Sequence, residues 1–216
     1  MPDTLSPSTP DPAAAKQLAL LTALAAEAKR ISSLGLVACT GGNFSVRLEV
    51  AVIGMSVSGK DKGALAPEDF IRVGMDSKPI PPDTRKPSDE TYLHVSLYAA
   101  TGCDAVCHGH PPHAVALSLG AGDSIRFRGI EMQKAFYGIM SHETDVVLPV
   151  IDNHQDMKVL STRALAAMRA ECPAVLVRGH GVYAWGRSVG EAGRQLETVE
   201  WLSKVHCIAR GLGIAV

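Results

Sequence analysis

The stretch that decides how this chain folds runs from Ala105 to Pro112 and reads Ala-Val-Cys-His-Gly-His-Pro-Pro. Its apolar beginning predicts a short buried strand, and the paired prolines keep the chain extended before a turn or a new helix. Residues i and i+2 of a strand project from the same face, so the imidazoles of His108 and His110 can converge on one metal ion. Alone, a His-x-His pair supports a metal only weakly, because single histidines more often pack or face solvent.

A third histidine far downstream, in Arg178-Gly179-His180-Gly181, makes the metal hypothesis much stronger. Three neutral imidazoles with an open fourth position are the usual arrangement of a catalytic zinc, which polarises a carbonyl or hydroxyl oxygen of the substrate. A structural zinc more often has a fourth protein ligand. Sites of three histidines also bind other divalent ions, so the pattern does not by itself fix the metal.

Composition and charge limit the kinds of partner. The 216 residues are 46% hydrophobic and 20% charged, which suits a soluble globular protein with a buried core. The formal net charge of -1 provides no general attraction to nucleic acid or to an acidic membrane, so a small-molecule partner is expected. Met1 to Pro10 lacks the basic segment of an export signal, and the apolar run from Leu18 to Ala26 is too short for a membrane span.

The cysteines indicate reduced thiols and a cytoplasmic protein. They are odd in number and lie in apolar or helical surroundings, which disfavours a disulfide framework. Cys103 and Cys107 beside His108 invite a zinc-finger interpretation, but Cys107 points to the opposite face of the strand from His108, so core packing is favoured. The five cysteines are Cys39, Cys103, Cys107, Cys172 and Cys207.

Helix and strand patterns alternate after a Pro-, Ser- and Thr-rich segment, 1–10, that is expected to be a flexible tail. Asp11-Pro12 resembles an N-cap followed by proline at the first helical position, and Ser88 is expected to cap a later helix. The close strand pairs at 44–57 and 174–185 need antiparallel neighbours, so we predict a mixed, largely antiparallel sheet covered by helices. Besides the strand of His108, the expected strands are 44–48, 51–57, 71–73, 125–127, 146–151, 174–177 and 182–185, and the expected helices are 11–32, 89–101, one from 111, 131–136, 155–169 and 189–210.

Two glutamates and several hydrogen-bond donors could complete an active site. Glu90 begins the helix that leads into the histidine strand, and Glu131 begins a later helix. Either could be an acid/base beside a metal that stabilises an enolate, although each alone is more often an ordinary helix N-terminal residue. Two glycine-rich turns, 40–43 and 58–63, offer backbone N–H groups suited to a phosphate, or are simply tight turns. The side-chain donors in and near these turns are Asn43, Ser58, Lys60, Lys62 and Ser88.

Four blocks of sequence, in order, resemble those of the class II aldolase and adducin-head family, whose zinc enzymes act on phosphorylated ketoses. The resemblance covers nearly the whole chain after the tail. The chain departs from the family pattern at Gly42 and Phe44, on either side of Asn43, and at Asp89, where a small residue is more common in the family. The blocks are Thr40-Gly41-Gly42-Asn43-Phe44-Ser45-Val46-Arg47, Ser58-Gly59-Lys60-Asp61-Lys62-Gly63, Lys86-Pro87-Ser88-Asp89-Glu90-Thr91 and His108-Gly109-His110-Pro111.

The resemblance implies a single α/β catalytic domain over 11–216, with helices on both faces of a mixed sheet in three layers. It implies one zinc per subunit on His108, His110 and His180. It also implies phosphate binding by the turns at Asn43 and Ser58-Gly59 with Ser88, to which the Lys62 turn contributes donors. A homo-oligomer is expected, with the tetramer as the favoured number of subunits and active sites near subunit interfaces.

Three further segments are most similar to a dehydratase branch of the family. These segments, 131–136, 149–156 and 178–186, imply zinc-dependent dehydration of 5-methylthioribulose 1-phosphate in methionine salvage, with Glu131 as acid/base. Glu90 occupies the acid/base position of the aldolase members, so a sugar-phosphate aldolase that breaks the C3–C4 bond is the nearest alternative. A non-catalytic adducin-like module is a more distant one, which the three histidines and two glutamates oppose.

Overall fold

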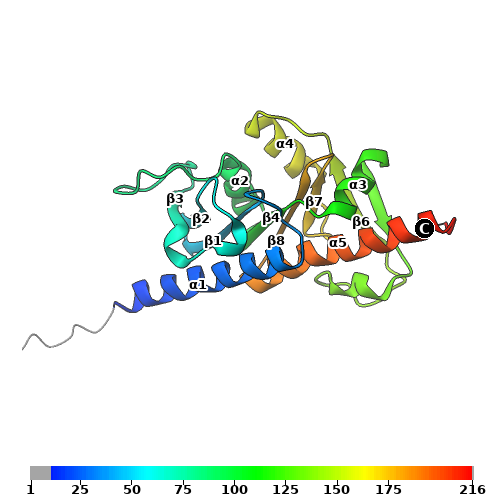
Figure 1. The fold of residues 1–216 in the computed structure, drawn as a ribbon, viewed down its shortest axis with the longest axis horizontal. Coiled ribbons are helices and arrows are strands. Elements are labelled where there is room, and N and C mark those ends of the chain that lie inside the picture. Colours follow the sequence, from blue (N-terminus) through cyan, green and yellow to red (C-terminus); the bar gives the residue numbers. More distant parts are fainter. Residues whose placement is uncertain (1–10, 216) are drawn as a thin grey trace, which may run out of the picture.

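A computed structural model of the protein describes residues 11–215, in which eight strands form one sheet (Figure 1). The strand order is β3-β2-β1-β4-β8-β7-β6-β5. All neighbouring strands pair antiparallel except β6 and β7, so the predicted mixed and largely antiparallel sheet is confirmed. The predicted flexible tail lies outside the described residues. The strands are β1 (Asn43–Glu49), β2 (Val52–Ser56), β3 (Phe70–Gly74), β4 (Ala105–Gly109), β5 (Ser124–Phe127), β6 (Val146–Ile151), β7 (Ala174–Val177) and β8 (Gly181–Gly186).

Helices cover both faces of the sheet, which gives the predicted three layers. One core cluster joins the sheet to α1, α3 and α5, and the other joins it to α2 and α4. In Figure 1, α1 and α5 run along one side, and α2 and α4 lie on the other. The helices are α1 (Pro12–Ser33), α2 (Thr91–Thr101), α3 (Pro112–Gly120), α4 (Met157–Ala167) and α5 (Val189–Gly211), with short 3-10 turns η1 (Lys62–Ala64), η2 (Pro67–Asp69) and η3 (Glu131–Ala135).

Strand β4 sits at the centre of the sheet and shows the two-residue period that the sequence predicts. Ala105 and Cys107 belong to the core on the α1 and α5 side, whereas Val106 belongs to the core on the α2 and α4 side. His108 shares the orientation of Val106, because the two residues lie two positions apart on one strand. Cys107 is fully buried on the opposite face, in agreement with its predicted packing role, and all five cysteines are free.

The first helix begins where its capping signal predicts, but the second does not. The Asp11 carboxylate accepts from the Ala13 amide at 3.0 Å, and Pro12 is the first residue of α1. Helix α2 begins at Thr91 and not at 89, so Ser88 is not its N-cap. Instead, the Ser88 hydroxyl accepts from the Glu90 amide at 3.3 Å. This leaves Glu90 as the last residue before the helix.

Two other predicted helices are shorter than expected, while several strands match their predicted bounds. The segment predicted as a helix at 131–136 is the 3-10 turn η3, and α4 spans Met157–Ala167 where 155–169 was expected. Strands β6 and β7 have the bounds that the sequence predicts. Within the described residues, no helix combines the length and apolar character that a membrane crossing requires.

Candidate active site

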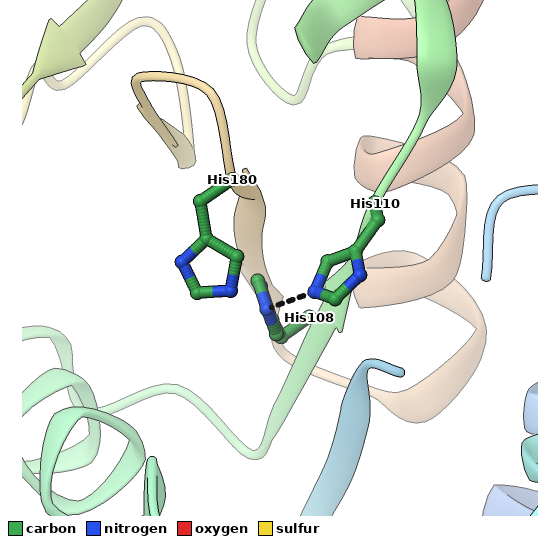
Figure 2. A group of neighbouring side chains, drawn as sticks. All are labelled: His108, His110 and His180. Carbon is green, nitrogen blue, oxygen red and sulfur yellow. Dashed lines mark hydrogen bonds between the residues drawn. The ribbon is translucent and has the colours of Figure 1, made fainter. Parts of the chain in front are cut away.

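Three histidines from two distant parts of the chain converge at one edge of the central strands (Figure 2). His108 lies in β4, His110 lies just past the end of β4, and His180 lies in the turn between β7 and β8. The Nε2 atoms of His108 and His110 are 3.0 Å apart. One nitrogen of each of the three rings lies within 4.8 Å of the others. The structure therefore brings together all three metal ligands predicted from the sequence.

Glycines allow these strands to approach closely. A Cβ on Gly181 would lie 2.3 Å from the Gly109 carbonyl oxygen and 2.7 Å from the His110 ring, so no larger residue fits without moving the backbone. Gly42 has a φ of +73°, and its Cβ would lie 2.7 Å from the His108 carbonyl oxygen. The departure from the family pattern at Gly42 thus has a steric reason in this chain.

Two contacts fix the orientation of the His108 ring. Its Nδ1 lies 2.9 Å from the Val182 carbonyl oxygen, which can only accept a hydrogen bond, so Nδ1 carries the proton and Nε2 is a free donor atom for a metal. Its face stacks on Tyr183, with 3.9 Å between ring centroids and 15° between planes. The β4–β8 register places these two residues directly opposite each other.

The cluster fits a divalent metal in both its charge state and its spacing. Burial lowers the pKa of His108 to about 3 and also lowers the pKa of His110, so both rings are neutral, as ligands must be. Nδ1 of His180 is buried without a hydrogen-bond partner. Two nitrogens on one tetrahedral zinc lie roughly 3.3 Å apart, close to the observed separation of the His108 and His110 nitrogens.

Glu90 completes the cluster. Its two carboxylate oxygens lie 3.2 Å from Nε2 of His108 and 3.2 Å from Nε2 of His180. The Asn43 side-chain amide donates to it at 2.6 Å. Burial alone would raise the pKa of Glu90, but the two histidines and Asn43 outweigh burial and hold this pKa well below its ordinary value. Glu90 is therefore an ionised carboxylate positioned beside the candidate metal ligands.

The predicted phosphate-binding turns lie next to each other in the fold. The Ser58 amide donates to the Lys86 carbonyl oxygen at 3.2 Å, which joins the turn after β2 to the segment that carries Ser88 and Glu90. Ser58 and Gly59 are exposed, and Ser88 is half-buried. Asn43 is buried, and its Oδ1 has no hydrogen-bond partner. A ligand at these turns would meet free donors and acceptors close to Glu90.

Lys62 differs from an ordinary surface lysine. Its side chain is 2% exposed, and Nζ donates to the carbonyl oxygens of Thr40 at 2.9 Å and Lys60 at 2.6 Å. Burial lowers its pKa. The ammonium therefore ties the 40–43 turn to the 58–63 turn, and its third N–H remains available. Lys60 itself pairs with Asp69 at 2.6 Å.

Glu131 is not part of this cluster within the chain. It lies at the start of η3, its side chain is 69% exposed, and its ionic partners are Lys134 and, at 3.8 Å, His142. The Lys134 hydrogen bond lowers the pKa of Glu131. The same segment exposes Tyr137 at 59% and Met140 at 86%. The two predicted acid/base residues thus occupy different environments.

Two groups near the histidines have no counterpart among the individually predicted site residues. Tyr183 lies between the His108 ring and the His94 ring, whose centroid is 5.9 Å away. His94 is buried and bonds through Nδ1 to Ser45 at 2.7 Å. A tyrosine three residues after His180 in an alternating strand is a weak signal, because its contact with His108 depends on strand register. His113, in the first turn of α3, bonds instead to Glu200 at 2.6 Å.

The mixed sheet, the three converging histidines and the half-buried glutamate are those of a class II aldolase-like α/β protein. The chain belongs to the family whose model is described as Class II Aldolase and Adducin N-terminal domain, which matches residues 22–207. The family membership predicted from the sequence motifs is confirmed.

Named relatives lie in the dehydratase branch. A methylthioribulose-1-phosphate dehydratase of Pseudomonas savastanoi pv. phaseolicola is 41% identical over 167 residues, which cover 76% of this chain and 81% of that protein. The protein of that name from Yersinia pseudotuberculosis is 44% identical over 84% of this chain and 83% of its own length. Among solved structures, L-fuculose-1-phosphate aldolase from Thermus thermophilus superposes with a TM-score of 0.76 at 28% identity, over 93% of this chain and 100% of that one.

Proposed function

We propose that this protein is a zinc-dependent hydro-lyase that converts 5-methylthioribulose 1-phosphate to 2,3-diketo-5-methylthiopentyl 1-phosphate in the cytoplasm. The observation that carries the proposal is the cluster of His108, His110 and His180 with one nitrogen of each within 4.8 Å of the others. It occurs in a chain 41% to 44% identical to proteins named methylthioribulose-1-phosphate dehydratase.

Three histidines would hold the metal, and the neutral state of His108 and His110 supports this role. When bound, zinc supplies a Lewis acid that polarises the substrate C2 carbonyl and so acidifies the C3 hydrogen. The hydrogen bond from His108 Nδ1 to the Val182 carbonyl keeps Nε2 directed at the cluster. Asn43 holds the Glu90 carboxylate beside the histidines.

The phosphate of the substrate would be bound by the turns that meet beside Glu90. The backbone N–H of Gly59 and the hydroxyl groups of Ser58 and Ser88 are donors in reach of solvent, because the Ser58 amide already donates to the Lys86 carbonyl oxygen. Lys62 Nζ donates to the carbonyl oxygens of Thr40 and Lys60, which leaves its third N–H as a further donor between the two turns. With the phosphate bound at these turns, the methylthio end of the substrate would point away from them.

The reaction requires one base and one acid. Glu131 would remove the C3 proton. The electron pair of the broken C3–H bond would form the C3–C4 double bond as the C4–O bond breaks, and the hydroxyl group would leave as water with a proton from the same carboxyl group. The resulting C3 enol gains a proton at C4 and becomes the 2,3-diketone. The lowered pKa of Glu131 means that it begins as a carboxylate able to accept the proton.

Because Glu131 forms no ion pair or hydrogen bond with His108, His110 or His180 of its own chain, we propose that it acts in the site of a neighbouring subunit. The exposed side chains Met132, Tyr137 and Met140 surround it on the same segment, and such an apolar surface next to a charged group suits a protein interface. The proposed homo-oligomer, a tetramer, would thus build each site from two chains. Light scattering measures the number of subunits.

A sugar-phosphate aldolase is the second candidate, and the position of Glu90 favours it. In that reaction the C4 hydroxyl loses its proton, the C3–C4 bond breaks, and its electron pair stays on the phosphate-bearing fragment. Glu90 lies 3.2 Å from two of the histidines, which suits proton transfer at C3. The products would be dihydroxyacetone phosphate and methylthioacetaldehyde.

The experiment is to incubate the zinc-loaded protein with 5-methylthioribulose 1-phosphate and to identify the products by NMR, with Glu131→Gln in parallel. Diketone phosphate from the parent, strongly reduced in the variant, is expected. Dihydroxyacetone phosphate with methylthioacetaldehyde would replace the dehydratase by an aldolase. A protein that binds no divalent metal on metal analysis would instead favour a non-catalytic adducin-like module.

A further inference from the structure

A cavity of about 310 Å³ lies away from the histidine cluster, at the C-terminal ends of α3 and α5 and beside β5. Figure 1 shows these two helix ends at the same end of the molecule. Leu117 and Ile125 provide an apolar part of its wall, and Arg126, Arg128, His206 and Arg210 provide the ionisable part. Among the described residues no carboxylate lines it, and none of its lining residues belongs to the proposed active site.

The three arginines carry more positive charge than their neighbours neutralise. Arg126 and Arg128 share a single carboxylate, Asp145, at 3.3 Å and 3.4 Å. Their side chains are 69% and 60% exposed, so these ion pairs are weak and easily rearranged. Arg210 forms no ion pair with any other described residue. An additional anion would therefore find unsatisfied guanidinium groups here.

His206 provides a separate indication of a ligand. Its side chain is 3% exposed, its Nδ1 is buried without a hydrogen-bond partner, and its ring packs edge-on against Phe127 at 4.9 Å. A buried polar atom normally has a partner, because leaving it unpaired costs free energy. A polar ligand in the cavity would meet this ring at its inner wall.

We propose that this cavity binds a small phosphate-bearing anion. Guanidinium groups match phosphate oxygens with paired N–H donors, and three of them around one small volume favour a multivalent oxyanion over chloride. Leu117 and Ile125 form an apolar part of the wall against which a short organic group could pack. Free phosphate and a phosphate ester share this chemistry, and binding measurements separate them.

The cavity wall is tied to the segment that carries His180. The Arg178 guanidinium donates to the carbonyl oxygens of Ala121 and Gly122, each at 2.8 Å, and the Gly179 amide donates to the Ser118 hydroxyl at 2.9 Å. Ala121 and Gly122 also line the cavity. An occupant of the cavity would thus lie against Ala121 and Gly122, whose carbonyl oxygens bind Arg178, two residues before His180.

The test is calorimetric titration of the metal-loaded protein with inorganic phosphate and, in parallel, with methyl phosphate, at constant ionic strength. We expect two sites per subunit, one in the proposed active site and one in the cavity. Arg210→Ala is expected to weaken only one of them, by about tenfold or more. The double variant Arg126→Ala/Arg128→Ala and the variant His206→Gln should weaken the same site. The tighter of the two probes identifies whether the free ion or an ester is preferred.

Arg72→Ala is the matched control, because Arg72 is also an exposed arginine paired with a carboxylate, Glu49, on a strand at the other edge of the sheet. It should leave both sites unchanged. A single phosphate site that Arg210→Ala does not affect would overturn the proposal. So would equal weakening by Arg72→Ala, or a change in subunit number with Arg210→Ala, which would identify a second copy of the chain as the occupant. None of these outcomes depends on turnover of the proposed substrate.

Discussion

Glu90 and Glu131 are the two carboxylates that the sequence nominates for catalysis, and the fold treats them differently. Glu90 is held by His108, His180 and Asn43 at 2.6 Å to 3.2 Å. Glu131 is exposed and is paired with Lys134 on its own short turn. The difference shows that one chain brings the candidate metal ligands together, whereas the proposed acid/base lies on the surface, where we propose that a second chain uses it.

The largest expected effect tests the role of the exposed carboxylate. Glu131→Gln should lower kcat for dehydration by about a thousandfold, because it removes the group that transfers the proton. Zinc content and thermal stability should stay unchanged, because Glu131 contacts no residue of the cluster. Steady-state kinetics and metal analysis check both parts. A variant with parental kcat would show that Glu90 or another group moves the proton.

A steric clash next to the histidine cluster should disrupt the part of the site that one chain forms by itself. Gly181→Ala should destabilise the protein by roughly 3 kcal/mol and reduce zinc binding, because the new Cβ would lie 2.3 Å from the Gly109 carbonyl oxygen. Chemical unfolding and zinc titration measure the two effects. Gly190→Ala is the control, since nothing lies within 4 Å of that Cβ in the first turn of α5. Equal stability of the two variants would contradict the close approach of β4 and β8.

His94 packs against Tyr183, which stacks on the His108 ring, and we expect it to affect the pH dependence of stability. Burial lowers the pKa of His94 to about 4, whereas the unfolded chain binds a proton near pH 6.5. Above pH 6.5 this pKa difference has no effect on stability. As pH falls from 6.5 toward 4, the unfolded chain binds the proton and the folded chain does not, so the free energy of unfolding falls progressively, by roughly 3 kcal/mol in total. His94→Gln should lose this dependence. Urea unfolding of parent and variant across this range tests it, and parallel pH curves would refute it.

The smallest expected effect concerns the support that Glu90 gives to the metal ligands. Glu90→Gln removes the charge that faces His108 and His180 and should weaken zinc binding about 10- to 100-fold. Competition with a chelator measures this affinity. Glu131→Gln is the matched control and should bind zinc like the parent. If both variants bind zinc equally, the distinction between the two carboxylates is not one of metal support.

The sequence predicts those parts of the site that depend on local spacing. His108 and His110 converge because a strand has a period of two residues, and the same period places Cys107 in the opposite core. The contact between His108 and Tyr183 depends on the register of strands far apart in the chain, which no local pattern fixes. Ser88 was expected to cap α2, but its hydroxyl accepts from the Glu90 amide before the helix begins. A serine side chain can bond to several nearby backbone amides, and the residue order does not show which of these bonds forms.

Glu131 marks the limit of what one chain can reveal. The motif around it suggests a catalytic residue, yet its own chain surrounds it with solvent, Lys134 and His142. Subunit contacts are set by surface complementarity and symmetry and not by the periodicity of a strand or helix. The sequence could therefore nominate the residue without indicating whether it acts in its own subunit or in a neighbouring one.

Mixed oligomers test most directly whether the two halves of the site come from different chains. Co-expression of Glu131→Gln subunits with His180→Ala subunits, each inactive alone, should restore dehydration in about a quarter of the sites of a randomly mixed ring, because some intact metal clusters then face an intact Glu131. If both residues act within one chain, every site in the mixture lacks one of them. Activity in the mixed oligomer no greater than that of the separate variants would contradict the account.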